Sequence, residues 1–352
     1  MRNKKSNLSN ITIDKETSPS NPVTKKQSKS PKVCLKLQPK PYFPLTSLLS
    51  KSPDSYSKAK NPKFLLLKKQ NQSSINKIQQ ACSLEEFDII EKTYLGLYYE
   101  SQSILRDDPL VIIHKALCKR TNKQVAVKSC KKQDFSIYST LKKESQTLSR
   151  LDHKNIVKYI ENFETEDSFH IVIEFIQGPT LFQFLKNQPF TRLGKNEVKN
   201  IFYQVIEGVE YLHKLGVAHG DLKLDNVLVC EQGVKIVDFG FSCSFDEVRT
   251  VFCGTGNYLS PEITLFQSYL PGPADVWALG VMLYTLSTGT FPFKAGHTQD
   301  LYKKIQKCSL NLPDYLSNSQ KNIITKMLKP DPKSRPTLKK LKKNQFFSKQ
   351  IN

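Results

Sequence analysis

The spacing of apolar residues divides the chain into two regions. Up to about residue 80 the sequence is rich in Lys, Ser, Asn and Pro and has no sustained apolar period. Such a segment cannot bury enough apolar surface to fold, so we predict a largely disordered tail over residues 1–85. From residue 87 onward apolar runs recur at regular intervals, and a folded domain is expected over residues 87–347.

The first part of the folded region has the pattern of a small sheet. Two apolar runs between Pro109 and Cys130 flank the polar pair Thr121-Asn122, which predicts a strand, a turn and a strand. Residues 139–151 have apolar positions at helical spacing and predict one helix. The runs at 156–163 and 169–175 predict two further strands. We therefore expect a sheet with one helix over residues 87–176.

Beyond Gly178-Pro179 the spacing becomes helical. A hydrophobic hairpin is expected between Asn226 and Asp238. A larger helical part is thus predicted over residues 177–347, and the fold class is α+β. The predicted helices lie at residues 181–187, 196–216, 274–289, 297–308 and 317–329.

Positive charge is concentrated in the tail. The formal net charge is +21, and residues 1–80 contain 17 Lys or Arg against 3 Asp or Glu. The folded region is only mildly basic, so we expect no nucleic-acid partner for it. The tail could bind RNA, an acidic lipid surface or an acidic protein, and the sequence does not choose among these partners.

The eight cysteines form no C-x-x-C pair and no cluster with zinc spacing. A reducing compartment fits this usage best. The N-terminus has no apolar run typical of a secretory signal, and no run is long enough to span a bilayer. We expect a protein of the cytoplasm or nucleus without a transmembrane segment.

The stretch from His219 to Gly240, HGDLKLDNVLVCEQGVKIVDFG, contains polar residues at a diagnostic spacing. Asp221, then Lys223, then Asn226 and finally Asp238-Phe239-Gly240 match the catalytic loop and metal-binding turn of protein kinases. Upstream, VAVK ends at Lys128, and Glu144 falls within the predicted helix. On these motifs the chain resembles the eukaryotic protein kinases over about residues 87–347.

The resemblance implies a two-lobed protein kinase fold, with a small β-rich N-lobe at about 87–176 and a larger helical C-lobe at about 177–347. It implies ATP and Mg²⁺ as cofactors and protein hydroxyl groups as substrates. D-L-K-x-x-N and Thr255 resemble the serine/threonine type. CGTGNYLSPE and DVWALGVMLYTL are similar to the calcium/calmodulin-dependent and AMP-activated kinase group.

The resemblance also implies a role for each matching residue. Asp221 would accept the proton of the substrate hydroxyl or orient that hydroxyl, and Lys223 would stabilise the transferred phosphoryl group. Lys128, paired with Glu144, would contact the α- and β-phosphates. Asn226 and Asp238 would hold two Mg²⁺ ions, which prefer oxygen ligands. The adenine pocket would consist of Ile113 and Ala126 above the ring, Leu228 below it, and the hinge backbone from Glu174 to Ile176.

Further matches are assigned supporting roles. A buried ion pair would join Glu262 to Arg335, and Asp275 would bond the backbone of the catalytic loop. For Asp275 a simple helix N-terminal charge is the alternative. For the apolar positions ordinary core packing explains the sequence equally well. Those positions are the adenine pocket, the gatekeeper Ile173 and a stacked spine of Leu148, His219 and Phe239.

The glycine-rich loop of the kinases is degenerate in this chain. Counting back from Lys128, its three glycine positions fall on Arg106, Asp108 and Val111. Asp108 brings a negative charge toward the phosphates, Arg106 would partly offset it, and Pro109 removes an N–H donor. Weak ATP binding follows as an expectation. A pseudokinase that serves as a binding or scaffolding module is therefore the alternative to an active serine/threonine kinase.

Gly220 is the second departure from the family pattern. Kinases usually have an Arg here that binds a phosphate on the activation loop, and the phosphorylated position falls on Val251. Receptor and phosphosite are missing together, so we infer that switching does not use this phosphate. Thr250, one position away, is a weak candidate site. Drift in a loop that other contacts already hold is the alternative explanation.

Overall fold

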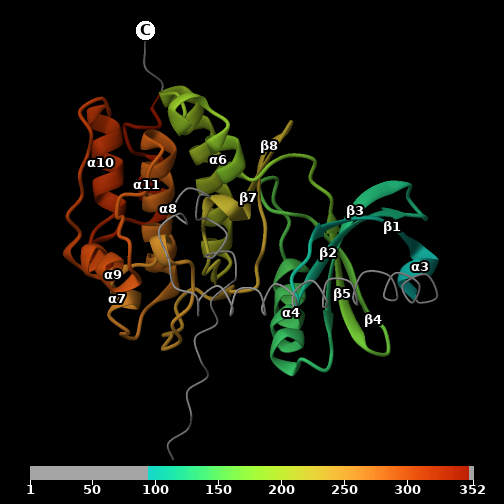
Figure 1. Cartoon of the computed structure of the whole chain (residues 1–352). Coiled ribbons are helices and arrows are strands. Elements are labelled where there is room, and N and C mark those ends of the chain that lie inside the picture. The colour runs from blue at the N-terminus through green and yellow to red at the C-terminus, as the bar shows by residue number, and fades with distance from the viewer. Residues whose placement is uncertain (1–93, 349–352) are drawn as a thin grey trace, which may run out of the picture. The chain divides into compact units, whose positions relative to one another are not determined.

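The computed structural model describes residues 94–348, in which a sheet is followed by a mainly helical region (Figure 1). The predicted tail lies outside the described residues, as do Cys34 and Cys82. The boundaries predicted for the tail and the domain stay predictions. None of the helices between residues 94 and 348 combines the length and the apolar character needed to cross a bilayer.

The N-lobe contains one antiparallel sheet with the strand order β1-β2-β3-β5-β4. The predicted strand–turn–strand unit is present, and Asn122 in its turn has a φ of 55°, which Asn tolerates better than most residues. The elements are α3 (Tyr94–Tyr98), β1 (Tyr99–Arg106), β2 (Ile112–Cys118), β3 (Lys123–Lys131), α4 (Phe135–Leu148), β4 (Tyr159–Glu164) and β5 (Ser168–Glu174).

The two faces of this sheet have different functions. Val125 and Val127 of β3 point into a small buried cluster on one face. Ala126 and Lys128 alternate with them and point to the other face, toward α4. Because directly paired residues share a face, Ile113 opposite Lys128 and Ile173 opposite Ala126 lie there too. Four residues assigned to nucleotide binding or gating are thus on one face.

The C-lobe is built around α8, which is buried along nearly its whole length. A helix that is apolar on all sides must be surrounded by other elements, and α8 supplies much of the main core. The predicted helices are confirmed with boundary shifts of a few residues. The helices are α5 (Leu181–Lys186), α6 (Lys195–Lys214), α7 (Pro261–Thr264), α8 (Pro271–Thr288), α9 (Thr298–Lys307), α10 (Asn318–Met327) and α11 (Leu338–Lys342).

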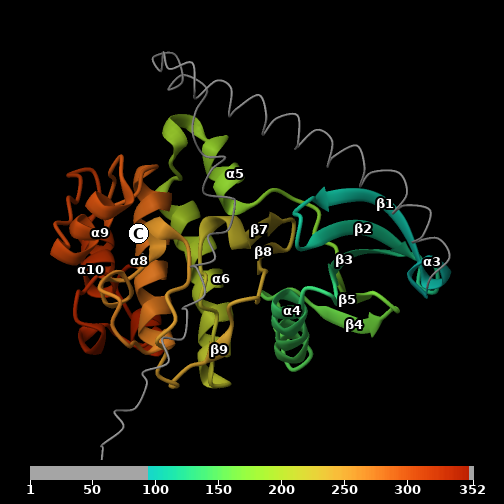
Figure 2. The ribbon, with the colours of Figure 1, turned by 60° about the horizontal axis from the view of Figure 1, so that its bottom comes forward.

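Two short hairpin-like sheets position the catalytic loop in the C-lobe. The predicted hydrophobic hairpin is β7 (Val227–Cys230) with β8 (Gly233–Ile236). The second sheet pairs β6 (Val217–Ala218) with β9 (Cys243–Ser244). Both lie between the helices of the C-lobe and the sheet with α4 (Figure 2).

Backbone hydrogen bonds join the end of the β7–β8 hairpin to the chain that leads from α4 to β4. Ile236 donates its N–H to the carbonyl of Asn155 at 2.8 Å and accepts from the N–H of Val157 at 3.0 Å. The side chain of Asn155 also donates to the carbonyl of Val234 at 2.9 Å. These bonds place α4 directly beside the turn that follows β8.

The strand β1 was not expected from the sequence. Its residues, YESQSILR, are mostly exposed and carry no strand-like alternation of apolar positions. They form a strand because β2 supplies hydrogen-bonding partners along their length, with register shifts after Ser101 and Ile104. The neighbouring strand thus determines the structure that the local sequence does not.

Candidate active site

Three elements meet at the ammonium group of Lys128. Its Nζ donates to both carboxylate oxygens of Glu144 at 2.8 Å and to Oδ1 of Asp238 at 2.9 Å. Lys128 comes from β3, Glu144 from α4 and Asp238 from the turn after β8. The predicted Lys128–Glu144 pair is therefore present, and it also reaches the residue assigned to metal binding.

Burial and charge act in opposite directions on the pKa values of this cluster. Burial favours the neutral form of Lys128, but Asp238 and Glu144 outweigh it and raise the lysine pKa. Burial raises the pKa of Glu144 despite the attraction of Lys128. For Asp238 burial is outweighed by Lys128, with Lys223 and Arg106 adding to the effect, so its pKa is lowered.

The turn that carries Asp238 has a strained backbone. Asp238 has a φ of 64°, which few residues other than glycine adopt without cost. The neighbouring Phe239 is buried, its ring lies 4.9 Å from that of His219, and its N–H donates to Glu144 at 3.3 Å. The predicted contact of Phe239 with His219 is confirmed, and Leu148 belongs to the same core cluster.

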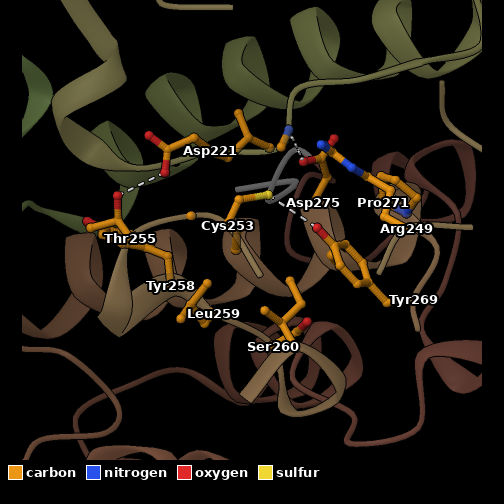
Figure 3. Close-up of a pocket in the computed structure, with 16 residues that line it drawn as sticks. Asp221, Arg249, Cys253, Thr255, Tyr258, Leu259, Ser260, Tyr269, Pro271 and Asp275 are labelled. Carbon is orange, nitrogen blue, oxygen red and sulfur yellow. Dashed lines mark hydrogen bonds between the residues drawn. The ribbon is translucent and has the colours of Figure 1, made fainter. Parts of the chain in front are cut away.

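The catalytic loop brings Asp221, Lys223 and Asn226 together with Thr255 of the later segment. Lys223 Nζ donates to Asp221 Oδ2 at 2.6 Å and to Thr255 Oγ1 at 3.0 Å. Thr255 donates to Asp221 Oδ1 at 2.8 Å (Figure 3). Asn226 Nδ2 donates to the Asp221 carbonyl at 2.8 Å. The arrangement surrounds one carboxylate with a cation and a hydroxyl, which suits it to orient a substrate hydroxyl group.

Asp275 binds the backbone of the catalytic loop, as predicted. Its carboxylate accepts the backbone N–H of His219 at 2.8 Å and that of Gly220 at 3.0 Å. It also lies 3.0 Å from Nε2 of His213. Its position within α8, with three such contacts, excludes the simpler interpretation as a helix-terminal charge.

Gly220 has a conformational reason to be glycine. Its φ is +77°, and a Cβ added there would lie 2.5 Å from the carbonyl oxygen of Phe241. Any side chain would have to push this backbone away or strain the loop. The structure thus supplies a cause for Gly220 beyond the loss of a phosphate receptor.

The activation segment is held by contacts of its own. Arg249 and Tyr269 exchange two backbone hydrogen bonds of 2.9 Å, and the guanidinium of Arg249 donates to the carbonyl of Phe241 at 3.3 Å. The thiol of Cys253 lies 3.3 Å from the hydroxyl of Tyr269 (Figure 3). The side chain of Val251 is exposed, and its backbone carbonyl accepts a hydrogen bond from the hydroxyl of Tyr269 at 3.3 Å. Sequence reasoning missed Arg249, for which the only signal was a basic residue just before the phosphosite position.

The predicted ion pair between Glu262 and Arg335 is present and buried. Two parallel hydrogen bonds of 2.7 Å join the guanidinium to the carboxylate. Arg335 also donates to three backbone carbonyls and lies over the ring of Trp277. With all its donors used, the pair fastens the end of the activation segment to α8 and the chain after α10.

Asn226 and Asp238 offer the donor set that Mg²⁺ requires. Both provide oxygen atoms, and Mg²⁺ is usually bound by one or two protein ligands together with waters and phosphate oxygens. Residues 94–348 contain no group of three or more His, Cys, Asp and Glu residues arranged for a metal. The pair therefore fits Mg²⁺ bound together with a phosphate ligand, in contrast to a metal held in a closed protein cage.

The residues assigned to the adenine pocket are less closely connected to one another than the residues around Lys128 and Asp221. Ile113 and Ala126 share the cleft face of the sheet, whereas Leu228 lies on β7 and is half-buried. The side chain of Glu174 accepts from the N–H of Lys158 and from Lys235, both at 2.7 Å, and its own N–H donates to the carbonyl of Lys158 at 2.9 Å. Ile176 packs against the main core. Their contacts with adenine stay predictions.

The degenerate loop joins β1 to β2 at the mouth of the cleft. Arg106 ends β1 and is paired with Ile113 of β2. Its guanidinium lies 3.7 Å from Asp108 and 4.0 Å from Oδ2 of Asp238. Asp108 also accepts the N–H of Leu110 at 3.0 Å. The predicted position of the loop is confirmed, and one of its side chains reaches the residue assigned to metal binding.

The chain is similar to known protein kinases. Residues 111–347, more than half of the chain, match the family model described as the protein kinase domain. CBL-interacting serine/threonine-protein kinase 8 of Arabidopsis thaliana is 35% identical over 213 residues, which are 59% of this chain and 47% of that protein. Its relative numbered 9 in the same plant is 34% identical over 238 residues, with shares of 65% and 53%. CBL-interacting protein kinase 31 of Oryza sativa subsp. japonica is 33% identical over 225 residues, with shares of 62% and 50%. The chain thus spans about half the length of the curated relatives it matches.

Proposed function

Because the chain belongs to the protein kinase family, we propose that it transfers the γ-phosphoryl group of MgATP to Ser or Thr hydroxyls of proteins. The observation that carries this proposal is the assembled cleft. Lys128, Glu144 and Asp238 form one cluster, and Asp221, Lys223 and Asn226 form a second one on the adjoining loop. Protein kinases use ATP with Mg²⁺, and each of these six residues is in hydrogen-bonding contact with a partner from the same set.

Each residue has a defined task in this reaction. Glu144 holds the ammonium of Lys128 at a fixed place on the N-lobe side of the cleft, where it would bind phosphate oxygens. Asn226 and Asp238 would hold Mg²⁺, which neutralises the phosphates when it is bound with ATP. Asp221 orients the acceptor hydroxyl and takes its proton, while Lys223 stabilises charge on the phosphoryl group as it moves.

The acceptor class is supported by Thr255. Its hydroxyl contacts both Lys223 and Asp221. A substrate with a short hydroxyl side chain would bind next to this group. The names of two relatives state serine/threonine specificity, in agreement with this assignment.

Protein substrates are the partners that this function requires. We place the protein in the cytoplasm or nucleus. The six cysteines within residues 94–348 are all free, which is compatible with a reducing compartment.

Phosphate transfer to a mixed peptide library tests the proposal. With MgATP the full chain should phosphorylate peptides that contain Ser or Thr and leave those with Tyr as the only acceptor unmodified. Asp221→Ala should abolish the transfer. Equal incorporation by both proteins would reject the enzyme and leave the pseudokinase, a binding module with the same fold, as the remaining interpretation.

A further inference from the structure

Arg106 occupies the position of the first glycine of the degenerate loop, and its side chain points into the cleft. The guanidinium lies 4.0 Å from Oδ2 of Asp238 and 3.7 Å from Asp108. The side chain is 41% exposed, so a ligand in the cleft can reach it. Asp238 is the residue assigned to Mg²⁺, and a cation so close to it is also close to any phosphate that shares the metal.

The donors of Arg106 are uncommitted. Both of its ion-pair distances are too long for hydrogen bonds, and within residues 94–348 its guanidinium forms none. Lys128 differs in this respect, because Glu144 and Asp238 already accept hydrogen bonds from its ammonium. Among the described residues, Arg106 is therefore the cation near Asp238 whose N–H groups remain available to a ligand.

Asp108 explains why the cleft needs this cation. It is half-buried in the same loop and accepts the N–H of Leu110, so its carboxylate is held beside the guanidinium of Arg106. Lys128 is already matched by two carboxylates, which leaves Asp108 uncompensated unless Arg106 is counted. An anionic ligand would meet net repulsion there without the guanidinium.

We propose that Arg106 is a phosphate-binding residue of this chain, which replaces with side-chain donors the backbone N–H groups that a glycine-rich loop would supply. A guanidinium presents planar, paired donors that match a phosphate group, and its reach does not require the close backbone approach for which glycines are needed. This inference rests on the proposed use of MgATP. On this proposal, the guanidinium donors of Arg106 replace the backbone N–H donors that are lost with the glycines.

The opposite role is also chemically defined. If Arg106 served as a lid on Asp238, it would compete with Mg²⁺ for the carboxylate, and its removal would strengthen nucleotide binding. The two roles therefore predict opposite signs for the same variant.

Equilibrium binding to the full-length chain separates these roles without any need for catalysis. We would measure the affinities of MgATP and adenosine by calorimetry for the wild type and for Arg106→Gln, which removes the charge and leaves a shorter polar side chain. The dissociation constant for MgATP should rise about tenfold, or about 1.4 kcal/mol. The affinity for adenosine, which has no phosphate, should be unchanged.

The matched control is Arg120→Gln. Arg120 lies in the turn between β2 and β3 and binds Glu161 at 3.1 Å, so its loss should leave both affinities unchanged. Arg106→Lys should retain part of the affinity for MgATP. Equal or tighter MgATP binding by Arg106→Gln, or no MgATP binding by the wild type, overturns the proposal. Binding by the wild type without phosphate transfer would reject the proposed kinase activity and leave the role of Arg106 intact.

Discussion

A single ammonium group connects three separate elements of the cleft. Lys128 is held by Glu144 on α4 and by Asp238 beyond β8, and each distance is short enough for a charge-assisted hydrogen bond. Because both carboxylates compete for one cation, the position of Lys128 reports on the placement of α4 as well as of the metal-binding turn. Loss of either carboxylate should move the lysine toward the other.

Glu144→Gln tests this dependence on a residue that touches Lys128. The amide can still accept one hydrogen bond but no longer supplies a charge, so Lys128 should shift toward Asp238. We expect kcat/KM for peptide phosphorylation to fall about 10²-fold, as is common when a positioning contact is lost. Steady-state kinetics and a thermal unfolding scan would be compared. An unchanged kcat/KM in a folded variant would contradict the role of this pair.

Gly220→Ala tests the conformational account of the catalytic loop. The added Cβ would meet the carbonyl of Phe241 at 2.5 Å while φ is positive, so the free energy of unfolding should fall by about 2–3 kcal/mol. Gly216 is a matched control, since it has a φ of +71° and open space around its Cβ position. Gly216→Ala should cost only about 1 kcal/mol for the backbone strain. Equal losses in urea unfolding would show that the approach of Phe241 is unimportant.

At the scale of elements, the activation segment and α4 are both held in place by contacts of the unmodified chain. The segment is bonded at Arg249, at Cys253 and at Thr255, and its end is fastened by Glu262. Val251, which stands where the family has its phosphosite, takes part only through its backbone carbonyl, which accepts a hydrogen bond from Tyr269. We therefore expect that no phosphate is required to hold this segment against the catalytic loop.

Thr250→Ala should therefore keep nearly full activity. The side chain of Thr250 is exposed and lies beside Arg249, whose backbone is already bonded to Tyr269. Arg249→Gln, in contrast, removes the bond to Phe241 and should increase hydrogen exchange in residues 245–255 while lowering activity. A Thr250→Ala variant with activity near zero would show that a phosphate at this position is required after all.

The sequence predicts those elements whose signals are local. The turn at Asn122 and the helices are encoded in short windows of residues, and Lys128 and Glu144 follow from their motif. The strand β1 could not be predicted, because its own residues are mostly polar and its hydrogen-bonding partners lie in the next strand. The contacts of Arg249 with Phe241 and of Arg106 with Asp238 could not be predicted either, because only the folded chain brings these residues together.

For the whole molecule, the pH dependence of stability includes a contribution from a buried histidine in the sheet. His170 on β5 is 6% exposed, bonds to Ser129 at 2.8 Å and stacks on Phe163. Burial lowers its pKa from 6.5 to about 4. Between these two values the unfolded chain binds a proton that the folded chain does not, so stability falls as the pH falls.

The difference between the wild type and His170→Phe isolates this contribution. From pH 7 to pH 5 the wild type should lose about 1–2 kcal/mol more of its unfolding free energy than the variant. Urea unfolding at the two pH values measures the difference between their slopes, which does not depend on any constant effect of the substitution. Parallel pH dependences would show that His170 is protonated as readily in the folded chain.

The central claim is that the chain is a kinase whose site is complete as folded. The most direct measurement is incorporation of the γ-phosphate into Ser/Thr peptides by the full chain after phosphatase treatment, with mass spectrometry confirming an unmodified activation segment. Asp221→Asn is the matched control, because it removes one charge and keeps the shape of the side chain. We predict rapid incorporation by the unmodified wild type and a loss of at least about 10²-fold in the variant. Equal rates for the two proteins, or no incorporation by the wild type before phosphorylation, would contradict the account.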